Sequence, residues 1–405
     1  MTDTVSTTTA ARPVTPARFT IAVLALAMGG FAIGTTEFVT MGVLPEIAEG
    51  VGVGTSTAGH LISAYAVGVV VGVPILSFFV AHLPRKGLLL ALMAAYALFN
   101  VLSAVAVDFH MLLVARFLDG LPHGAYFGVA TIVATSMAKP SHRGRAVALV
   151  MLGLSVANVI GVPFATWLGQ TAGWRAPYAA AAGLALLTVV LVQISVPHFP
   201  GDPNATGRSE AGRFFTNKQV WLTMLAGAIG FGGMFAAYSY ISPIVTDTAG
   251  LAEGAVPWFV FAFGIGMVVG TWVAGEMARW SVMGSLLASS LGMIAVLGLF
   301  WLVAPTGWWL APVAFLTTAV ASVLVINLQV RLMDVADDAV TLGAAMNHAS
   351  LNIANALGAF AGGIALDTWS AREAPLVGAG LAGAGFKGNA ESAHPDARRC
   401  RVGAS

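Results

Sequence analysis

Long apolar runs constrain this chain more than any other feature. A helix of about 20 apolar residues is long enough to cross the hydrocarbon core of a bilayer. Apolar residues make up 58% of the chain and charged residues only 9%, whereas a globular domain carries about 25% charged residues. The sequence therefore predicts an all-α polytopic membrane protein. The expected spans are residues 19–43, 57–80, 87–107, 111–135, 146–168, 176–196, 219–243, 256–277, 284–304, 308–332 and 341–366.

Two polar regions lie outside these runs. Residues 1–18 are rich in Thr, Ala and Pro, and we expect them to be disordered. The apolar run that follows continues past Gly30 without an A-x-A cleavage site, so we expect a retained span and not a signal peptide. Residues 198–218 contain Pro, Gly and charges of both signs, which predicts a linker.

The distribution of basic residues predicts the orientation. Lys and Arg accumulate on the cytoplasmic side of membrane proteins. A cytoplasmic N-terminus places twelve of the 19 Lys and Arg residues on that side and only Arg175 and Arg372 on the other. We therefore expect the N-terminus and the linker to be cytoplasmic.

The chain repeats itself about halfway along its length. Val70-Val71-Gly72 recurs as Val268-Val269-Gly270, and Pro45 recurs as Pro243, both 198 residues later. A parallel repeat is typical of one large class of transporters, in which substrate binds between the halves near the membrane midplane. The expected divisions are an N-terminal six-helix half at 19–197, the linker at 198–218, a C-terminal half at 219–386 and a polar tail at 387–405.

The repeat predicts a twelfth span that the sequence does not complete. The sixth span begins at Ala176, and its counterpart begins at Ala374 but is rich in Gly and Ala. Lys387 ends this run after about 13 residues, which is too short for the bilayer core. We expect a truncated twelfth span. The alternative is an eleven-span protein whose C-terminus lies outside.

Three ionisable residues share one apolar run. Arg116 and Asp119 stand three residues apart on one helical face, and His123 follows one turn later. A charge in mid-membrane costs about 2.5 kcal/mol or more, so such residues usually mark a pathway or a proton relay. The pair could switch when Asp119 is protonated, or could be a permanent ion pair. His123 could relay protons or could be a hydrogen-bonded packing residue.

Glu37 is the corresponding feature of the first span. It lies ~27 Å from the start of that span, and Arg116 lies ~9 Å from the opposite start of its antiparallel span, at ~1.5 Å per residue. Both residues are then expected in the outer half of the membrane. A buried carboxylate near a cation can alternate between its protonated and charged forms. The alternative is a glutamate that reaches water at the outer interface.

Further polar and aromatic residues in the spans are candidates for contact with a substrate. Interhelical hydrogen bonds explain such polar residues equally well, and contact with lipid explains the aromatic ones. A bend around Gly161 and Pro163 is a candidate gate, because proline removes a backbone donor. The substrate candidates are Asn158, Phe235, Tyr238, Asn327, Asn347, His348, Asn352 and Asn355.

Three segments resemble one family. G-T-T-E-F-V-T-M-G-V-L-P at residues 34–45 resembles a first-span signature, and residues 116–125 resemble the fourth-span motif R-x-x-x-G-x-x-x-A. Residues 153–169 are similar to a fifth-span antiporter motif. Together they resemble the major facilitator superfamily, specifically its twelve-span drug:proton antiporters of the chloramphenicol-efflux and arabinose-efflux type. The resemblance implies two six-helix halves and a role for Arg116 in proton transfer.

The chain departs from this family in the loop between spans 2 and 3. The family pattern there is G-x-x-x-D-R-x-G-R-K, and Ala81 stands where the aspartate is expected. Arg85 and Lys86 keep the basic end of the motif. For this loop, the resemblance to the family therefore implies only a gating role for these two cytoplasmic charges.

The resemblance implies a proton-coupled exporter in a bacterial inner membrane, since the residues by themselves supply only ionisable groups within the membrane. The resemblance implies a small amphipathic substrate such as chloramphenicol, with coupling through Glu37, Arg116, Asp119 and His123. We expect a monomer in the lipid bilayer without a cofactor. The formal net charge of +1 predicts no nucleic-acid partner. The single cysteine, Cys400 in the tail, excludes a disulfide framework and a thiolate metal site, and we expect no metal. A sugar or metabolite exporter is the nearest alternative, and a non-transporting membrane protein is another. A polytopic membrane enzyme is disfavoured, because the sequence contains no H-E-x-x-H, no metal-ligand cluster and no nucleophile elbow.

Overall fold

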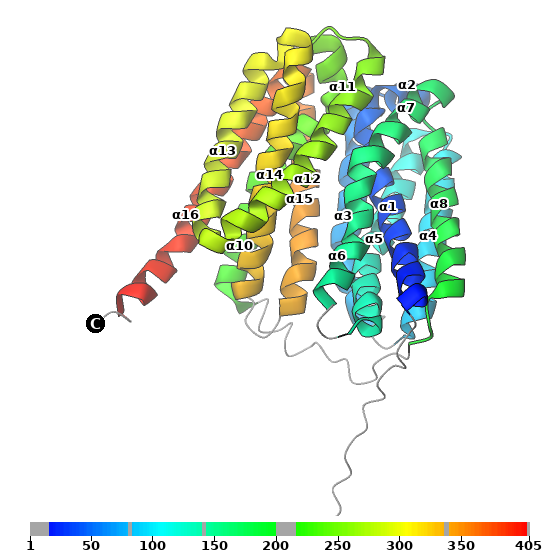
Figure 1. Cartoon of the computed structure of the whole chain (residues 1–405). Helices are drawn as coiled ribbons and strands as arrows, with labels where there is room; N and C mark the ends of the chain where they lie inside the picture. The colour runs from blue at the N-terminus through cyan, green and yellow to red at the C-terminus, as the bar shows by residue number, and fades with distance from the viewer. Residues whose placement is uncertain (1–15, 80–82, 140–142, 200–215, 336–339, 403–405) are drawn as a thin grey trace, which may run out of the picture.

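The computed structural model describes residues 16–79, 83–139, 143–199, 216–335 and 340–402. Within these ranges the chain is helical and contains no strand, and its long helices run side by side in one bundle (Figure 1). The expected all-α architecture is confirmed. The elements of the first half are α1 (Pro16–Gly42), α2 (Leu44–Val51), α3 (Thr55–Phe79), α4 (Arg85–Ala104), α5 (Phe109–Met137), α6 (Arg143–Val156), η2 (Ala157–Gly161), α7 (Val162–Ala172) and α8 (Ala176–Ser195). Those of the second half are α10 (Lys218–Tyr238), α11 (Ile241–Pro243), η3 (Ile244–Thr248), η4 (Glu253–Ala255), α12 (Val256–Trp280), α13 (Val282–Val303), η5 (Ala304–Trp309), α14 (Leu310–Val335), α15 (Val340–Thr368), η7 (Ala371–Glu373) and α16 (Ala374–Val402).

The long helices have the length and composition of membrane spans. In the described part of the chain, nine helical stretches are long and apolar enough to cross a membrane. One of them, from Val282 to Val335, contains both α13 and α14. Neither α5, which carries Arg116 and Asp119, nor α16 is among the nine. The prediction of a polytopic membrane protein is therefore confirmed, whereas a twelfth apolar span is not.

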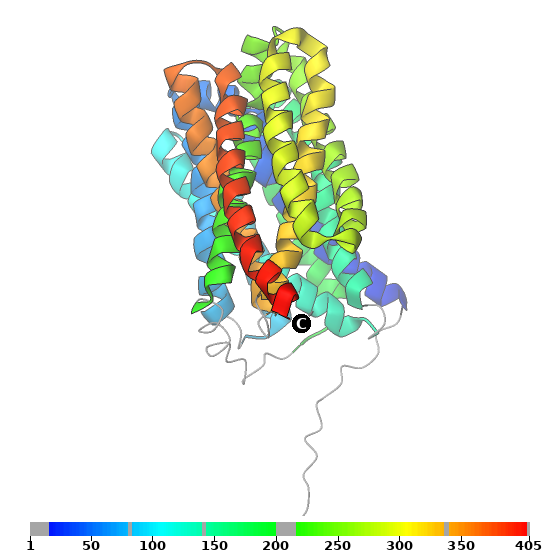
Figure 2. The ribbon, with the colours of Figure 1, turned by 90° about the vertical axis from the view of Figure 1, so that its left-hand side faces the viewer.

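The last helix differs from the sequence-based expectation. We expected the run from Ala374 to end at Lys387, but α16 continues as a helix to Val402 and runs the length of the bundle (Figure 2). Asn389, which we placed in a polar tail, is buried and donates a hydrogen bond to Ser290 Oγ at 3.2 Å. Backbone hydrogen bonds within a helix do not require apolar side chains, so the loss of hydropathy at Lys387 does not end the helix.

Two other boundaries also differ. The expected span 219–243 is interrupted, because α10 ends at Tyr238 and the short helix α11 follows it. The first half breaks at the equivalent place, where α2 begins after α1 with Pro45 in its first turn; proline lacks the N–H that would continue a helix. At the N-terminus α1 begins at Pro16, so residues 16–18 are helical. The rest of the segment that we expected to be disordered lies outside the described residues, as does most of the linker.

Among the described residues, the apolar cluster that draws on both halves joins them in the upper part of the bundle. We call the face where α1 and α10 begin the lower face and the opposite one the upper face (Figure 1). One apolar cluster lies within residues 22–196 and a small one within residues 220–349. The largest cluster draws on both halves and includes Leu44 and Tyr240, beyond the upper ends of α1 and α10. The halves are therefore joined through the upper part of the bundle.

Hydrogen bonds between the halves lie in the same region. Ser56 Oγ donates to the carbonyl oxygen of Gly363, and Ser63 Oγ donates to that of Ala356, each at 3.1 Å. Both bonds join the upper half of α3 to the upper half of α15. They close the upper face, because each one fixes a side chain of one half to the backbone of the other.

Gly264 allows a second close approach between the halves. A Cβ atom at this position in α12 would clash with the backbone carbonyl oxygen of Asn158 in η2, whereas a Cβ at Gly275 in the same helix would meet nothing within 4 Å. We expect Gly264→Leu to separate the N-terminal and C-terminal halves at the upper face, and Gly275→Leu to leave this contact closed. The measurement is the yield of a disulfide between Ser63→Cys and Ala356→Cys.

This cross-link is formed in a Cys400→Ser background with a protease site placed in the linker, so that linked halves stay together on a non-reducing gel. We expect a high yield with Gly275→Leu and a several-fold lower yield with Gly264→Leu. Equal yields from the two variants would contradict the close contact between α12 and η2.

Candidate functional site

A cavity of about 520 Å³ lies between the two halves. Its wall is formed by α1, α5, α6 and η2 from the first half and by α10, α12, α14 and α15 from the second. This volume is in the range that accommodates a drug-sized molecule. The lining is largely apolar, with a few polar groups contributed by both halves. The predicted site residues that line it are Glu37, His123, Asn158, Phe235, His348 and Asn352, whereas Tyr238, Asn327, Asn347 and Asn355 do not.

Glu37 occupies the wall of this cavity. It is 7% exposed and is followed in α1 by Phe38, which also lines the cavity. The Phe38 ring stacks on the Phe235 ring of the other half at 6.4 Å between centroids and lies 5.8 Å from the Tyr238 ring. Tyr238 therefore supports the aromatic part of the wall from behind. The carboxylate lies at a junction of the two halves.

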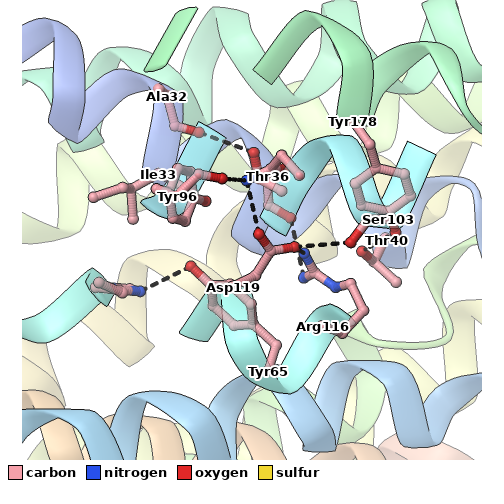
Figure 3. Close-up of polar contacts among 12 residues, drawn as sticks. Ala32, Ile33, Thr36, Thr40, Tyr65, Tyr96, Ser103, Arg116, Asp119 and Tyr178 are labelled. Carbon is pink, nitrogen blue, oxygen red and sulfur yellow. Dashed lines mark hydrogen bonds and ion pairs between the residues drawn. The ribbon is translucent and has the colours of Figure 1, made fainter. Parts of the chain in front are cut away.

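Arg116 and Asp119 form a fully buried ion pair in α5 (Figure 3). Arg116 Nη1 lies 3.2 Å from Asp119 Oδ2, in the i,i+3 arrangement that the sequence suggested. Asp119 also accepts hydrogen bonds from Asn100 Nδ2 at 2.9 Å and from Ser103 Oγ at 3.0 Å. Its carboxylate is thus held by three donors behind the cavity wall.

Arg116 reaches from this pair toward α1. Its Nη2 donates to the carbonyl oxygen of Thr36 at 3.4 Å, and its guanidinium lies over the Tyr65 ring at 4.4 Å and the Tyr178 ring at 5.4 Å from the centroids (Figure 3). It is close enough to Glu37 to act on it electrostatically, although the ion pair that Arg116 forms among the described residues is with Asp119. A cation over aromatic faces is stabilised by their quadrupoles.

His123 connects this cluster to the cavity. Its Nδ1 lies 2.9 Å from the Tyr65 hydroxyl, and its ring lies 5.5 Å from the Phe127 ring. The Phe127 ring in turn stacks on His348 of the other half at 6.1 Å between centroids. Two imidazoles, one from each half, therefore flank one phenyl ring at the cavity.

Asn158 and Asn352 contribute the amides of the wall. Asn158 lies in the π-helical turn η2, just before Pro163 in the first turn of α7. Each amide donates through Nδ2 to the carbonyl oxygen four residues earlier, at 3.0 Å. Among the described residues, Oδ1 of each has no hydrogen-bond partner.

The two basic residues expected to gate the carrier lie within one half. Lys86 Nζ donates to the carbonyl oxygen of Gln193 at 2.6 Å, which ties α4 to α8. The backbone N–H of Arg85 donates to the carbonyl oxygen of Phe199 at 3.1 Å. Neither contact joins the halves, and the preceding loop with Ala81 lies outside the described residues.

Some residues of the site were not found from the sequence. Asn100, Ser103 and Tyr178 are polar residues in apolar helices, a signal that would have flagged them as interhelical partners. Their partners stand on other helices, so spacing along the chain does not connect them. Within the described residues, no three His, Cys, Asp or Glu side chains come together as metal ligands.

Comparisons with known proteins place this arrangement in a family. The family model described as Major Facilitator Superfamily matches residues 26–359. The inner membrane transport protein YdhP of Escherichia coli is 38% identical over 89% of this chain and 92% of its own length. The putative transporter AraJ of Escherichia coli is 34% identical over 85% of this chain and 87% of its own. The chloramphenicol resistance protein of Streptomyces lividans is 31% identical over 88% and 92%.

Solved structures share the fold. The nucleoside transporter NupG matches with a TM-score of 0.74 at 14% identity, covering 92% of this chain and 99% of its own. A D-xylose-proton symporter matches with a TM-score of 0.70 at 16% identity, covering 92% and 97%. The match of the family model across most of the chain, together with relatives above 30% identity, leads to one conclusion. The chain belongs to the major facilitator superfamily of membrane transporters.

Proposed function

We propose that this transporter exports small amphipathic compounds such as chloramphenicol in exchange for protons, as a monomer in a bacterial inner membrane. The observation that carries the proposal is the position of Glu37 in the wall of a largely apolar cavity between the halves. A titratable carboxylate exposed to the substrate space gives protons and substrate one common site of action. Rocking of the two halves about that site would expose it alternately to each side.

Coupling in this proposal rests on two states of Glu37. The charged carboxylate is attracted by Arg116, which already contacts the carbonyl oxygen of the neighbouring Thr36. Protonation removes that attraction and leaves a neutral wall. Asp119 keeps Arg116 in place in both states through the ion pair at 3.2 Å. The contact from Tyr65 to His123 offers a route for protons between the Arg116 cluster and the cavity.

The apolar lining favours a drug-like substrate over a sugar. Phe38, Phe231 and Phe235 line the cavity beside aliphatic residues, and such surfaces bind apolar compounds by excluding water. A sugar site needs hydrogen-bonding groups around the whole ligand. The relative from Streptomyces lividans is a chloramphenicol resistance protein, which agrees with this choice.

The function is tested by export from cells that express the chain. We expect energy-dependent export of chloramphenicol or ethidium, and we expect a protonophore to stop it because the proton gradient is the driving force. Export that persists with a protonophore would contradict proton coupling. The absence of export of both compounds would contradict the proposed substrate class.

The proposed orientation places the lower face in the cytoplasm. In a Cys400→Ser background, a cysteine in place of the exposed Val107, near the upper end of α4, should react with an impermeant maleimide in intact cells. A cysteine in place of the exposed Lys139, at the lower end of α5, should react only after permeabilisation. The reverse pattern of labelling would show that the upper face is cytoplasmic.

A further inference from the structure

Two asparagines in the cavity wall leave hydrogen-bond acceptors unused. Asn158 is 7% exposed and Asn352 is 4% exposed, and both line the cavity. Oδ1 of each residue has no partner in the described part of the chain. One oxygen belongs to each half of the transporter.

The orientation of both amides follows from hydrogen-bond chemistry. Asn158 Nδ2 lies 3.0 Å from the carbonyl oxygen of Leu154, and Asn352 Nδ2 lies 3.0 Å from that of His348. A carbonyl oxygen only accepts, so the amide group facing it must be the NH₂. Each side chain is thereby anchored to its own helix, and the group that is left over is an acceptor.

An unpaired acceptor in this position favours the binding of a ligand that carries a hydrogen-bond donor. Leaving a buried acceptor without a hydrogen bond is unfavourable, and an N–H or O–H group that reaches it removes much of this penalty. Both oxygens are buried in this structure, so a donor group of a ligand reaches them when the cavity wall moves to admit it. Glu37, in the same wall, is also an acceptor when charged, and none of the described lining residues is Lys or Arg.

We propose that Asn158 and Asn352 are specificity-determining residues, each of which accepts a hydrogen bond from a donor group of the exported compound. Two donors on one compound then connect η2 of the first half to α15 of the second. This inference rests on the proposed export function and narrows its substrates to amphipathic compounds that carry at least two hydrogen-bond donors. A compound of the same shape whose donors have been methylated is a poor substrate.

The test compares export of matched compounds. Chloramphenicol is paired with a derivative in which its two hydroxyl groups are methylated, and ethidium with a derivative in which its two amino groups are fully methylated. For whichever of the two pairs is transported, we expect the wild-type protein to export the parent compound about tenfold or more better than its methylated derivative. One lost hydrogen bond to a buried acceptor corresponds to about that factor.

Asn158→Leu and Asn352→Leu should each lower this preference several-fold, because leucine has a similar volume and no acceptor. Asn327→Leu is the matched control. Asn327 is buried, donates Nδ2 to the carbonyl oxygen of Val323 at 2.9 Å and has an unpaired Oδ1 among the described residues, but it does not line the cavity. Its substitution should keep the wild-type preference.

The outcomes separate this inference from the function on which it rests. Equal export of parent and methylated compounds by the wild-type protein would overturn the inference and leave the export function standing, and this result does not depend on any variant folding. An equal loss of preference in Asn327→Leu would also overturn it. Failure to export either parent compound would overturn the proposed function and the inference together.

Discussion

Replacing Glu37 with glutamine should reduce protonophore-sensitive export to the background of cells that lack the protein. Glutamine has nearly the same shape and can still form hydrogen bonds, but it cannot take up or release a proton. Glu37 is the carboxylate that lines the cavity among the described residues, so its loss removes the group on which proposed coupling depends. The measurement is chloramphenicol or ethidium efflux at equal membrane expression.

The matched control is Glu49→Gln. Glu49 lies in α2 and is exposed, so neutralising it changes the net charge equally without touching the cavity, and export should stay at the wild-type level. If Glu37→Gln retains protonophore-sensitive export, coupling does not depend on Glu37. His123 and His348, the imidazoles of the same wall, would then be the groups to test.

The second large effect concerns the buried ion pair. Arg116→Met should destabilise the protein by about 3–5 kcal/mol, because it leaves the Asp119 carboxylate buried without a compensating charge. Asn100 and Ser103 would still donate to the carboxylate, but neither carries a charge. We expect less folded protein in the membrane and a lower melting temperature of the purified protein in detergent.

A surface pair provides the control for this prediction. Arg279 and Glu276 have the same i,i+3 spacing and the same 3.2 Å separation, but their side chains are 75% and 53% exposed. Arg279→Met should therefore cost less than about 1 kcal/mol. The double variant Arg116→Met/Asp119→Leu should recover much of the stability lost in the single variant, because two apolar side chains leave no buried charge without a partner. Equal melting temperatures for Arg116→Met and Arg279→Met would contradict this account.

The sequence predicted the features of the fold that depend on local composition. Apolar runs locate the long helices because each span must satisfy its backbone hydrogen bonds internally. The same reasoning does not locate the end of α16. The apolar run stops at Lys387 but the helix continues to Val402, because hydropathy reports the surroundings of a helix and not its continuity. The expected span 219–243 was wrong beyond Tyr238, where an apolar run continues in sequence but the helix does not.

The site was predictable only where its contacts are local. Arg116 and Asp119 are three residues apart on one helix, so their pairing followed from helical geometry. The contact from Tyr65 to His123 spans 58 residues and left no such signal. Asn327 was expected to face substrate and does not line the cavity. Helices that are apolar on nearly all sides do not reveal which face turns inward.

The π-helical turn η2 shifts the register of one membrane-crossing helix. A π turn contains one more residue than an α turn, so the residues of α7 are rotated by ~100° from where an uninterrupted α-helix continuing α6 would place them. A helical wheel drawn through residues 143–172 consequently assigns the wrong faces to one end. A relative with the same number of residues but no π turn between positions 157 and 161 would present a different side of α7 to its neighbours, and its aligned residues there would not be structural equivalents. A relative that lacks one residue in this stretch and is α-helical throughout would keep the same side of α7 toward its neighbours.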